Sequence, residues 1–382
     1  MMRAAVFSRQ GPPSELRVVE DLPAPGKPGH GELRLRVVAA GCNPVDYKQR
    51  SGELPGLLMM PRPWIVGLEA SGVVEAVGDG AGEAFSVGDR VAVCVPPVLR
   101  RWGCCAELLV CRAEHCCRLW HGAPGTVDGE GDGEGDGDGA QPAGDDLRRR
   151  ITLTEAAGVP LCGLTAWQSL ECLRHLKGGD AILVHAGAGG VGSMVCQMAK
   201  RRGLHVTATC GPDNLEFLRR ELRVDRAVDY TARPFEEQLR GVAFDGVVDV
   251  IGGEYEARSR ALLGPRGKYV SVINSGYVRL YNGSSYDGEE MFALWRIRSE
   301  IARAAAVVSS LFLSATGLGR PFSFVAVQPS GAQLAEVFSL IGEGHLRVFV
   351  ERVFGLGEIR EAHAQLARNH TRGKIVLRVA GR

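Results

Sequence analysis

Hydrophobic positions follow two different patterns along the chain. Up to about residue 120, the apolar residues form short runs bounded by Gly, Pro and Asp, with examples at residues 2–7, 33–38, 72–77 and 90–94. Short runs with such boundaries are typical of β-strands. From Leu153 onward the apolar runs alternate with helical stretches, which indicates a second kind of domain.

The second half of the chain predicts a parallel sheet. Candidate strands lie at residues 182–184, 206–208, 226–228, 246–250 and 269–272, with helical stretches such as 213–222 and 234–240 between them. Strands that alternate with helices through short turns form parallel sheets with right-handed crossovers. The expected fold class is therefore α/β, with a doubly wound parallel sheet of the Rossmann type and a separate β-rich domain.

The domain boundaries follow from this change of pattern. We expect the β-rich domain at residues 1–152 and the Rossmann domain at residues 153–328. The rest of the chain, residues 329–382, contains a predicted helix at 332–342, a strand at 346–353, a helix at 358–368 and a strand at 374–379. We expect this last segment to return to the first domain.

An acidic tract interrupts the first domain at about residues 122–147. It alternates Gly with Asp and Glu and has almost no apolar residue, so burial cannot offset the entropy lost on ordering. We expect a disordered surface insertion. A calcium-binding EF-hand loop starting at Asp128 is not supported, because its twelfth position, which requires Glu, is Gly139.

The most informative motif is the turn Gly187-Ala188-Gly189-Gly190-Val191-Gly192, which directly follows the apolar run at residues 181–184. The first glycine of such a motif permits a tight turn, the second lets the backbone approach a pyrophosphate, and the last lets helix and strand pack closely. The helix predicted next, at residues 193–201, would aim its free N–H groups at that pyrophosphate. The motif predicts a dinucleotide-binding site.

Composition narrows the range of partners and compartments. The formal net charge is +1, so neither nucleic acid nor an anionic membrane surface is an expected partner. The eleven cysteines are odd in number and no secretory signal precedes them, which favours reduced thiols and a cytoplasmic location. The longest uncharged stretch, at residues 304–319, is too short to span a membrane and is expected to be a buried helix.

Five separate segments carry a resemblance to a known family. They are residues 41–52 (GCNPVDYKQRSG), 67–78 (GLEASGVVEAVG), 163–167 (GLTAW), the glycine-rich turn and residues 372–377 (RGKIVL). In this order and spacing they resemble the medium-chain dehydrogenase/reductase superfamily. Within it the chain is similar to the zinc-free quinone oxidoreductase branch, including its ζ-crystallin-like and reticulon-interacting oxidoreductase-like members. The resemblance implies a GroES-like fold for the β-rich catalytic domain, and it leaves a mitochondrial location open.

The branch assignment depends on missing metal ligands. Zinc alcohol dehydrogenases of this superfamily hold a catalytic metal with Cys, His and Cys or an acidic residue. By the resemblance these positions fall at Asn43, Leu68 and Leu161. Leucine cannot bind zinc, so no metal site is expected and a zinc alcohol dehydrogenase is disfavoured. The cysteines between residues 104 and 117 lack CxxC spacing and are expected to be buried or half-buried thiols.

Without zinc there is no Lewis acid to polarise an alcohol. The resemblance therefore implies hydride delivery from NADPH to a quinone or an α,β-unsaturated carbonyl. The candidate catalytic residues are Asn43, Asp46 and Tyr47. Asn43 could donate a hydrogen bond to the acceptor, and Tyr47 could donate a proton directly or through water. The alternative is that Asn43 and Asp46 only form a turn around Pro44.

The end of the second Rossmann strand bears on the choice of cofactor. NAD-preferring domains place an Asp or Glu about 20 residues after the glycine-rich turn. Residues 206–211 contain no carboxylate, so NADP is favoured over NAD. The resemblance implies cofactor contacts from Cys210, Gly211 and Tyr230, the last matching a tyrosine that contacts the 2′-phosphate in related reductases. Arg219 or Arg220 could also reach that phosphate or could lie on a solvated helix face.

Further cofactor contacts follow from the resemblance alone. Thr165 and the backbone of residues 250–253, including Gly252, are expected beside the nicotinamide. Residues 322–324 and 370–374 are expected to close over the cofactor from the other domain. Their members in the expected site are Phe324, His370, Thr371, Arg372 and Lys374.

A second functional class stays open at this point. The chain could be a regulatory protein that binds the cofactor with little turnover, because a fold does not establish an activity. The intact glycine-rich turn and the polar set Asn43, Asp46 and Tyr47 favour an enzyme. The acceptor is not specified, because its pocket depends on loops at residues 51–63 and 276–295. A homodimer is one assembly that stays open.

Overall fold

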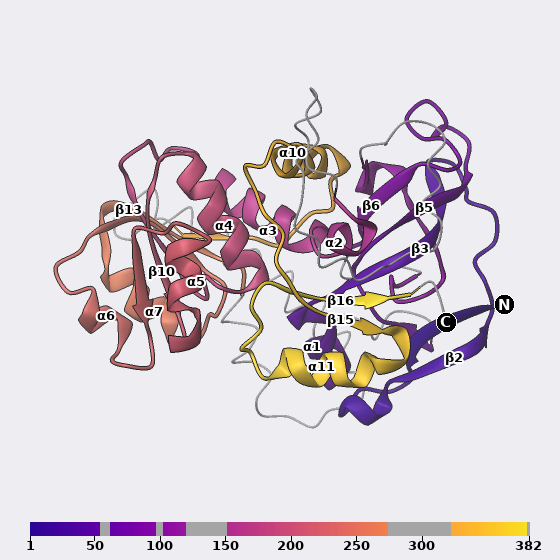
Figure 1. The fold of residues 1–382 in the computed structure, drawn as a ribbon, viewed down its shortest axis with the longest axis horizontal. Coiled ribbons are helices and arrows are strands. Elements are labelled where there is room, and N and C mark those ends of the chain that lie inside the picture. The colour runs from indigo at the N-terminus through magenta and orange to yellow at the C-terminus, as the bar shows by residue number, and fades with distance from the viewer. Residues whose placement is uncertain (54–61, 97–101, 120–150, 274–321, 380–382) are drawn as a thin grey trace, which may run out of the picture.

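The computed structural model of the protein describes residues 1–53, 62–96, 102–119, 151–273 and 322–379. The acidic tract, the uncharged stretch at residues 304–319 and most of the two acceptor loops lie outside the described residues. Figure 1 shows two lobes, one rich in β-strands and one of mixed helices and strands, with helices α2 and α3 near the junction. Within the described residues, no helix is long and apolar enough to cross a membrane.

The β-rich lobe contains two sheets. The smaller has the order β2-β1-β4, and the larger has the order β15-β16-β3-β5-β6-β8, with β7 also paired to β3. Burial alternates along β3, where Leu33 and Leu35 are fully buried and Arg36 is exposed, as one buried sheet face requires. The strands are β1 (Met2–Phe7), β2 (Arg17–Leu22), β3 (Glu32–Cys42), β4 (Trp64–Ile65), β5 (Glu69–Val77), β6 (Arg90–Cys94), β7 (Leu108–Arg112), β8 (Cys116–Arg118), β15 (Val350–Gly355) and β16 (Lys374–Arg378).

The α/β lobe is built on one parallel sheet with the order β11-β10-β9-β12-β13-β14. In chain order this is the doubly wound arrangement, in which ligands bind at the carboxyl ends of the strands where the order reverses. That point lies between β9 and β12. The strands are β9 (Ala181–Val184), β10 (His205–Cys210), β11 (Arg226–Asp229), β12 (Phe244–Asp249), β13 (Leu263–Ser271) and β14 (Phe322–Phe324).

Helices cover the sheets and connect the lobes. Helix α3 packs against both α4 and α10, and α1 packs against α11 beneath β15 and β16 (Figure 1). The described helices are α1 (Pro44–Ser51), α2 (Leu153–Ala157), α3 (Pro160–Glu171), α4 (Gly190–Arg201), α5 (Leu215–Arg220), α6 (Phe235–Gln238), α7 (Tyr255–Ala261), α10 (Gly331–Gly342) and α11 (Ile359–Ala367).

The end of the chain rejoins the first sheet. Strand β16 pairs antiparallel with β3, with Leu377 opposite Ala40, and it pairs parallel with β15. Along β16 the residues Ile375, Val376 and Leu377 are fully buried, so this strand is part of the core of the β-rich lobe. The segment before it reaches the α/β lobe, because the Gly373 N–H donates to the Ala188 carbonyl at 2.8 Å.

The predicted α/β class with a Rossmann-type sheet is confirmed, and local boundaries differ in a few places. Helix α4 begins at Gly190, three residues before the expected start. Helix α1 was not predicted, and β15 begins at Val350 instead of residue 346. All eleven cysteines are free thiols, and the five between residues 104 and 117 are buried, as expected.

One expected position is wrong. Residues 322–324 form β14, which pairs parallel with β13, so this segment belongs to the Rossmann sheet and does not approach from the other domain. The physical reason is the apolar fit within the sheet. Phe322 stacks on Tyr269 with ring centroids 5.9 Å apart, and Arg260 lies over both rings.

Candidate active site

The glycine-rich turn lies at the carboxyl end of β9. A Cβ atom on Gly187 would lie 2.7 Å from the Cβ of Ala208, and one on Gly192 would overlap the Ala186 carbonyl oxygen. Gly187 is therefore required by the close approach of β10, and Gly192 by the approach of helix α4 to the turn. On Gly189 the nearest atom to such a Cβ would be 3.4 Å away, so its face of the turn is open. This open backbone and the following α4 N-terminus suit a bound pyrophosphate.

Residues from neighbouring strand ends gather at the same edge. Gly211 follows β10 in extended backbone, with φ −76° and ψ 166°, and a Cβ there would have only the Tyr230 hydroxyl within 4 Å, at 3.9 Å. The Tyr230 N–H donates to the Cys210 carbonyl at 3.2 Å. Gly252 lies after β12 with φ 75° and donates its N–H to Asp249. Cys210, Gly211, Tyr230 and Gly252 thus share one edge with the glycine-rich turn.

Arg372 joins this edge from the C-terminal segment. Its Nε donates to Asn214 Oδ1 at 2.8 Å and its Nη2 donates to the Asp213 carbonyl at 3.1 Å. Its guanidinium also lies over the ring of Phe217. The turn that Arg372 contacts begins at Gly211, since the Asn214 N–H donates to the Gly211 carbonyl. An exposed cation therefore lies beside the strand end where the sequence has no carboxylate.

The polar set at residues 43–47 lies at the start of α1. Asp46 accepts the backbone N–H of Asn43 at 2.8 Å, which is the N-terminal capping arrangement that a local turn-forming role predicts. The side chain of Asn43 points elsewhere and is nearly buried, with 4% exposure. The Tyr47 hydroxyl donates to Asn369 Oδ1 at 3.3 Å. Burial and the nearby Glu53 raise the pKa of Tyr47, so its proton stays on the hydroxyl at neutral pH.

A buried charged network surrounds Asn43. The Lys374 ammonium donates to Glu69 Oε1 at 2.7 Å, to the Cys42 carbonyl at 2.9 Å and to Asn43 Oδ1 at 2.5 Å. Asn43 Nδ2 donates to the same Glu69 oxygen at 2.7 Å, and the Leu161 N–H donates to the other Glu69 oxygen at 2.7 Å. Glu69 is fully buried and Lys374 is 5% exposed.

The surroundings of this network raise the pKa of the Lys374 ammonium and of the neighbouring Cys42 and Cys162 thiols. Burial by itself lowers the pKa of Lys374, but Cys162, Glu69 and the hydrogen bond to Glu69 raise it above its usual range. Burial raises the pKa of Cys162 to about 11 and also raises that of Cys42. At neutral pH the ammonium of Lys374 is therefore charged, and the adjacent thiols are not thiolates.

The remaining residues expected to contact the cofactor are Thr165, Phe324, His370 and Thr371. Thr165 lies on α3, is 7% exposed, and donates its hydroxyl to the Leu161 carbonyl at 2.7 Å. His370 is exposed, and Phe324 is 42% exposed on β14. Thr371 has a buried hydroxyl with no hydrogen-bond partner among the described residues. Their expected cofactor contacts stay predictions.

The structure adds Glu69, which the sequence interpretation did not select. It is the single charged residue in the apolar stretch from Ile65 to Val74. A carboxylate in a buried strand needs a partner, and that isolation was the available signal. Its partner Lys374 was selected for a cofactor contact, but the structure places the ammonium against Glu69 and Asn43. Within the described residues, no group of three or more His, Cys, Asp or Glu could hold a metal ion.

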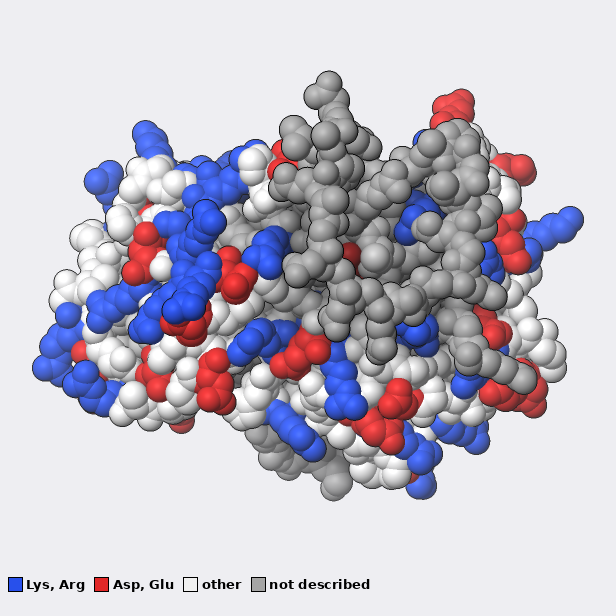
Figure 2. Space-filling view, viewed as in Figure 1, with Lys and Arg blue, Asp and Glu red and all other residues white. Residues whose placement is uncertain are grey.

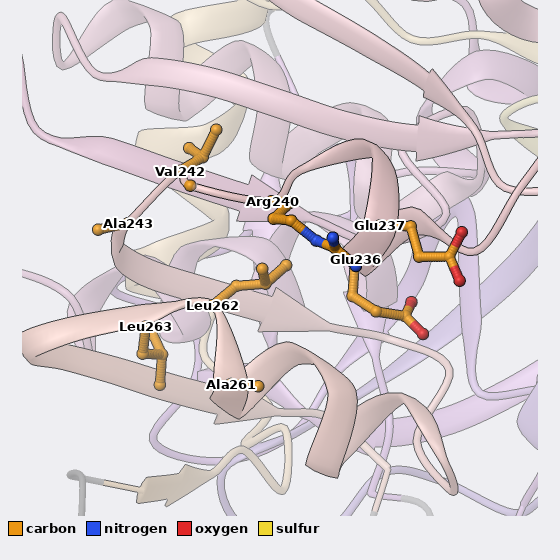
Figure 3. Close-up of a pocket in the computed structure, with 9 residues that line it drawn as sticks. Glu236, Glu237, Arg240, Val242, Ala243, Ala261, Leu262 and Leu263 are labelled. Carbon is orange, nitrogen blue, oxygen red and sulfur yellow. The ribbon is translucent and has the colours of Figure 1, made fainter.

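A surface pocket elsewhere is not part of this site. It has a volume of about 500 Å³ and is lined by residues of α6, α7 and the adjoining strands, including Glu236, Arg240 and Leu262 (Figure 3). Its residues 241–243 immediately precede β12, so it lies at the amino ends of the strands, opposite the glycine-rich turn. Dinucleotides bind at the carboxyl ends in this type of sheet.

On the face shown in Figure 2, the charges of the described residues give no further indication of a partner. On the face shown in Figure 2, Lys and Arg side chains are interspersed with Asp and Glu on both lobes, with basic side chains more frequent over the α/β lobe. Many of the basic residues are paired locally, as in Lys200 with Asp225 at 2.8 Å and Arg258 with Glu236 at 2.7 Å.

Comparison with known proteins identifies the family. Residues 29–136 match the alcohol dehydrogenase GroES-like domain, and residues 222–377 match a domain described as zinc-binding dehydrogenase. The chain is 31% identical to a quinone oxidoreductase of Pseudomonas aeruginosa, with 99% of each chain covered. It is 30% identical to the mitochondrial NAD(P)H oxidoreductase RTN4IP1 of Danio rerio, covering 99% of this chain and 92% of that protein.

Solved structures agree with these relatives. A quinone oxidoreductase from Coxiella burnetii superposes with a TM-score of 0.75 at 26% identity, covering 99% of both chains. A mycobacterial protein solved in complex with NADPH superposes with a TM-score of 0.71 at 27% identity, again over 99% of both chains. The chain therefore belongs to the medium-chain dehydrogenase/reductase superfamily, among the quinone oxidoreductases.

Proposed function

We propose that this protein is a zinc-free, NADPH-dependent reductase of quinones or α,β-unsaturated carbonyls. The observation that carries the proposal is the chain of contacts that joins Asn43 to the glycine-rich turn. Lys374 donates to Asn43, and the N–H of the preceding residue, Gly373, donates to Ala188 in that turn. The relatives support an NAD(P)H oxidoreductase, and one relative is a 2-haloacrylate reductase of Burkholderia, a name that describes reduction of an activated double bond.

The residues fit NADPH at three points. The open backbone at Gly189 and the N-terminus of α4 would hold the pyrophosphate. The open space at Gly211, bordered by the Tyr230 hydroxyl, would receive the 2′-phosphate, and no carboxylate oxygen lies within 4 Å of a Cβ built there. Arg372 would supply the positive charge, because its guanidinium already contacts the turn that begins at Gly211. NADH would leave this space and this charge unused.

The proposed chemistry needs little from the protein beyond orientation and one proton. NADPH, when bound, would supply the hydride, and the acceptor would take up that hydride together with one proton. Asn43 has a second Nδ2 hydrogen beyond the one given to Glu69, and it would donate to the acceptor oxygen as negative charge develops there. Tyr47, which is protonated at neutral pH, would deliver the proton directly or through water, although burial and Glu53 raise its pKa and so make it a weaker acid.

The absence of a catalytic metal is part of the proposal. By the resemblance, the positions that hold zinc in related enzymes correspond to Asn43, Leu68 and Leu161, and two of these three side chains have no donor atom. The polar atoms of Asn43 already bind Glu69 and Lys374. Polarisation of the acceptor would therefore come from hydrogen-bond donors of the protein.

The test is an assay of NADPH and NADH oxidation against a panel of quinones and enones. We expect turnover with NADPH, and a fall in kcat of about 10²- to 10³-fold for Asn43→Ala, as for loss of one oxyanion donor. NADPH affinity should change little in that variant. Tight NADPH binding without turnover of any acceptor would contradict the proposal and favour a regulatory cofactor-binding protein.

A further inference from the structure

The three positions that correspond by resemblance to zinc ligands of related enzymes lie around one carboxylate in this chain. Asn43 Nδ2 and the Leu161 N–H each donate to Glu69 at 2.7 Å, one to each oxygen, and Leu68 is its neighbour in the chain. Glu69 is 0% exposed. The carboxylate therefore lies among the positions where a metal would have its ligands, and it brings a negative charge into a buried site.

Lys374 balances that charge from the far end of the sequence. Its ammonium has three N–H groups, and the three acceptors Glu69 Oε1, Asn43 Oδ1 and Cys42 O use all of them. Replacing a buried ion pair by apolar residues is often neutral or stabilising, so such a pair is weak evidence for a purely structural role. The side chain of Lys374 also packs against the glycine-rich turn, because a Cβ on Gly190 would lie 2.9 Å from Lys374 Cδ.

We propose that Lys374 is a positioning residue that orients and polarises Asn43 toward the substrate acceptor, in the place where related enzymes use zinc. This inference rests on the proposed function. An Asn side chain has nearly the same shape in its two flipped orientations, so packing alone does not select one. An ammonium group only donates, so the carbonyl oxygen of Asn43 must face Lys374, and its amide nitrogen must face Glu69 and the acceptor side.

The positive charge also strengthens the donor. A charge-assisted hydrogen bond to the carbonyl oxygen of Asn43 draws electron density from its amide nitrogen, which makes the remaining N–H a better donor. The effect is the one a metal would have on an acceptor oxygen, transmitted through one side chain. The expected contact between Lys374 and the cofactor need not involve the ammonium, since every N–H of that group already has an acceptor.

The experiment compares three variants in the full-length protein. Lys374→Met leaves Glu69 buried without its partner, so this variant tests stability as well as activity. The double variant Glu69→Gln/Lys374→Met removes both charges and keeps one acceptor oxygen, which can serve either Asn43 or Leu161. Lys200→Met is the matched control, because it removes an ammonium from an ion pair on the α/β lobe that lies outside the site.

We expect the double variant to recover most of the melting temperature lost in Lys374→Met, while kcat stays at least about tenfold below wild type. Its Kd for NADPH should stay within about twofold, whereas loss of a phosphate contact would weaken it by tenfold or more. Lys200→Met should change none of these values. Recovery of kcat together with the melting temperature, or a tenfold weaker NADPH affinity, would overturn the inference.

A combination with Asn43→Ala shows whether Lys374 affects kcat directly or through Asn43. If Lys374 works through Asn43, adding Glu69→Gln/Lys374→Met to Asn43→Ala should not lower kcat further, because coupled residues are not additive. Independent multiplication of the two losses would contradict the inference.

A measurement without turnover completes the test. In protein labelled with ¹⁵N at asparagine, the side-chain amide signal that disappears in Asn43→Ala should shift in the double variant and not in Lys200→Met. An unshifted signal would overturn the orienting role of Lys374. If wild type reduces no quinone or enone, the proposed function fails, and the amide signal still decides whether Lys374 orients Asn43.

Discussion

The cofactor preference is most directly tested by Gly211→Asp. Gly211 has φ −76° and ψ 166°, a conformation open to any residue, and a new Cβ would have only the Tyr230 hydroxyl within 4 Å. Gly211 also precedes a short helical turn at Pro212–Asn214, where Asp is a favourable capping residue. The substitution therefore adds a carboxylate with little expected cost to the fold.

The magnitude follows from the charge that the carboxylate would face. At an effective dielectric near 20, two like charges about 4 Å apart repel by roughly 4 kcal/mol before screening. Salt, local adjustment and the nearby guanidinium of Arg372 reduce this value. Even about 1.4 kcal/mol is a tenfold change in affinity. The same carboxylate would accept hydrogen bonds from the ribose hydroxyls of NADH, so its affinity should rise.

The assay is titration of both cofactors against wild type, Gly211→Asp and Gly211→Asn. The Asn variant is the matched control, because it has nearly the same shape as Asp without the charge. We expect wild type to favour NADPH, Gly211→Asp to reverse the preference and Gly211→Asn to leave NADPH ahead. Equal wild-type affinities for NADH and NADPH, or the same loss in the Asn and Asp variants, would refute the electrostatic argument.

Three further predictions follow from other residues. Tyr230→Phe should weaken NADPH by about 0.5–1.5 kcal/mol, or somewhat more for a charged acceptor, and leave NADH unchanged in the same titration. Metal analysis of the purified protein should return no stoichiometric zinc, and chelators should not shift its melting; about one zinc per chain would contradict the assignment of Leu68 and Leu161. Burial, and to a smaller extent the positive charge of Arg50, lowers the pKa of His363 from 6.5 to about 3. Because the unfolded chain then binds one more proton than the folded one, the free energy of unfolding should fall by about 1.4 kcal/mol per pH unit as pH drops below about 6.5. His363→Leu should remove that contribution in urea unfolding at pH 7.5 and 5.0, and an unchanged difference between the two pH values would count against it.

The sequence by itself determined the parallel sheet and the glycine-rich turn. Both depend on local rules, since strand and helix periodicity extend over a few residues and a glycine requirement comes from immediate neighbours. The expected strand at residues 182–184 is β9, which begins only one residue earlier, at Ala181. The sequence also showed that Gly211 stands where NAD-preferring domains have a carboxylate, because that position lies at a nearly constant distance along the chain from the glycine-rich turn.

Local patterns were ambiguous where one segment serves two purposes. Asn43 and Asp46 were interpreted either as catalytic residues or as turn-formers, and the structure places Asp46 in a helix cap and directs Asn43 into a buried network. The strand at residues 322–324 was expected to come from the other domain. A segment of only three residues, Phe-Ser-Phe, is too short to show a periodicity that could assign it to a sheet, and its pairing with β13 depends on tertiary packing.

Only the tertiary structure decided which distant residues meet. Lys374 and Glu69 are 305 positions apart, and Arg372 and Asn214 are 158 apart. These contacts form because β16 returns to pair with β3, and this pairing brings the residues just before β16 to the glycine-rich turn. An isolated charge such as Glu69 in an apolar strand shows that a partner is needed. Which residue supplies that partner depends on how the chain folds back, and no local pattern contains that information.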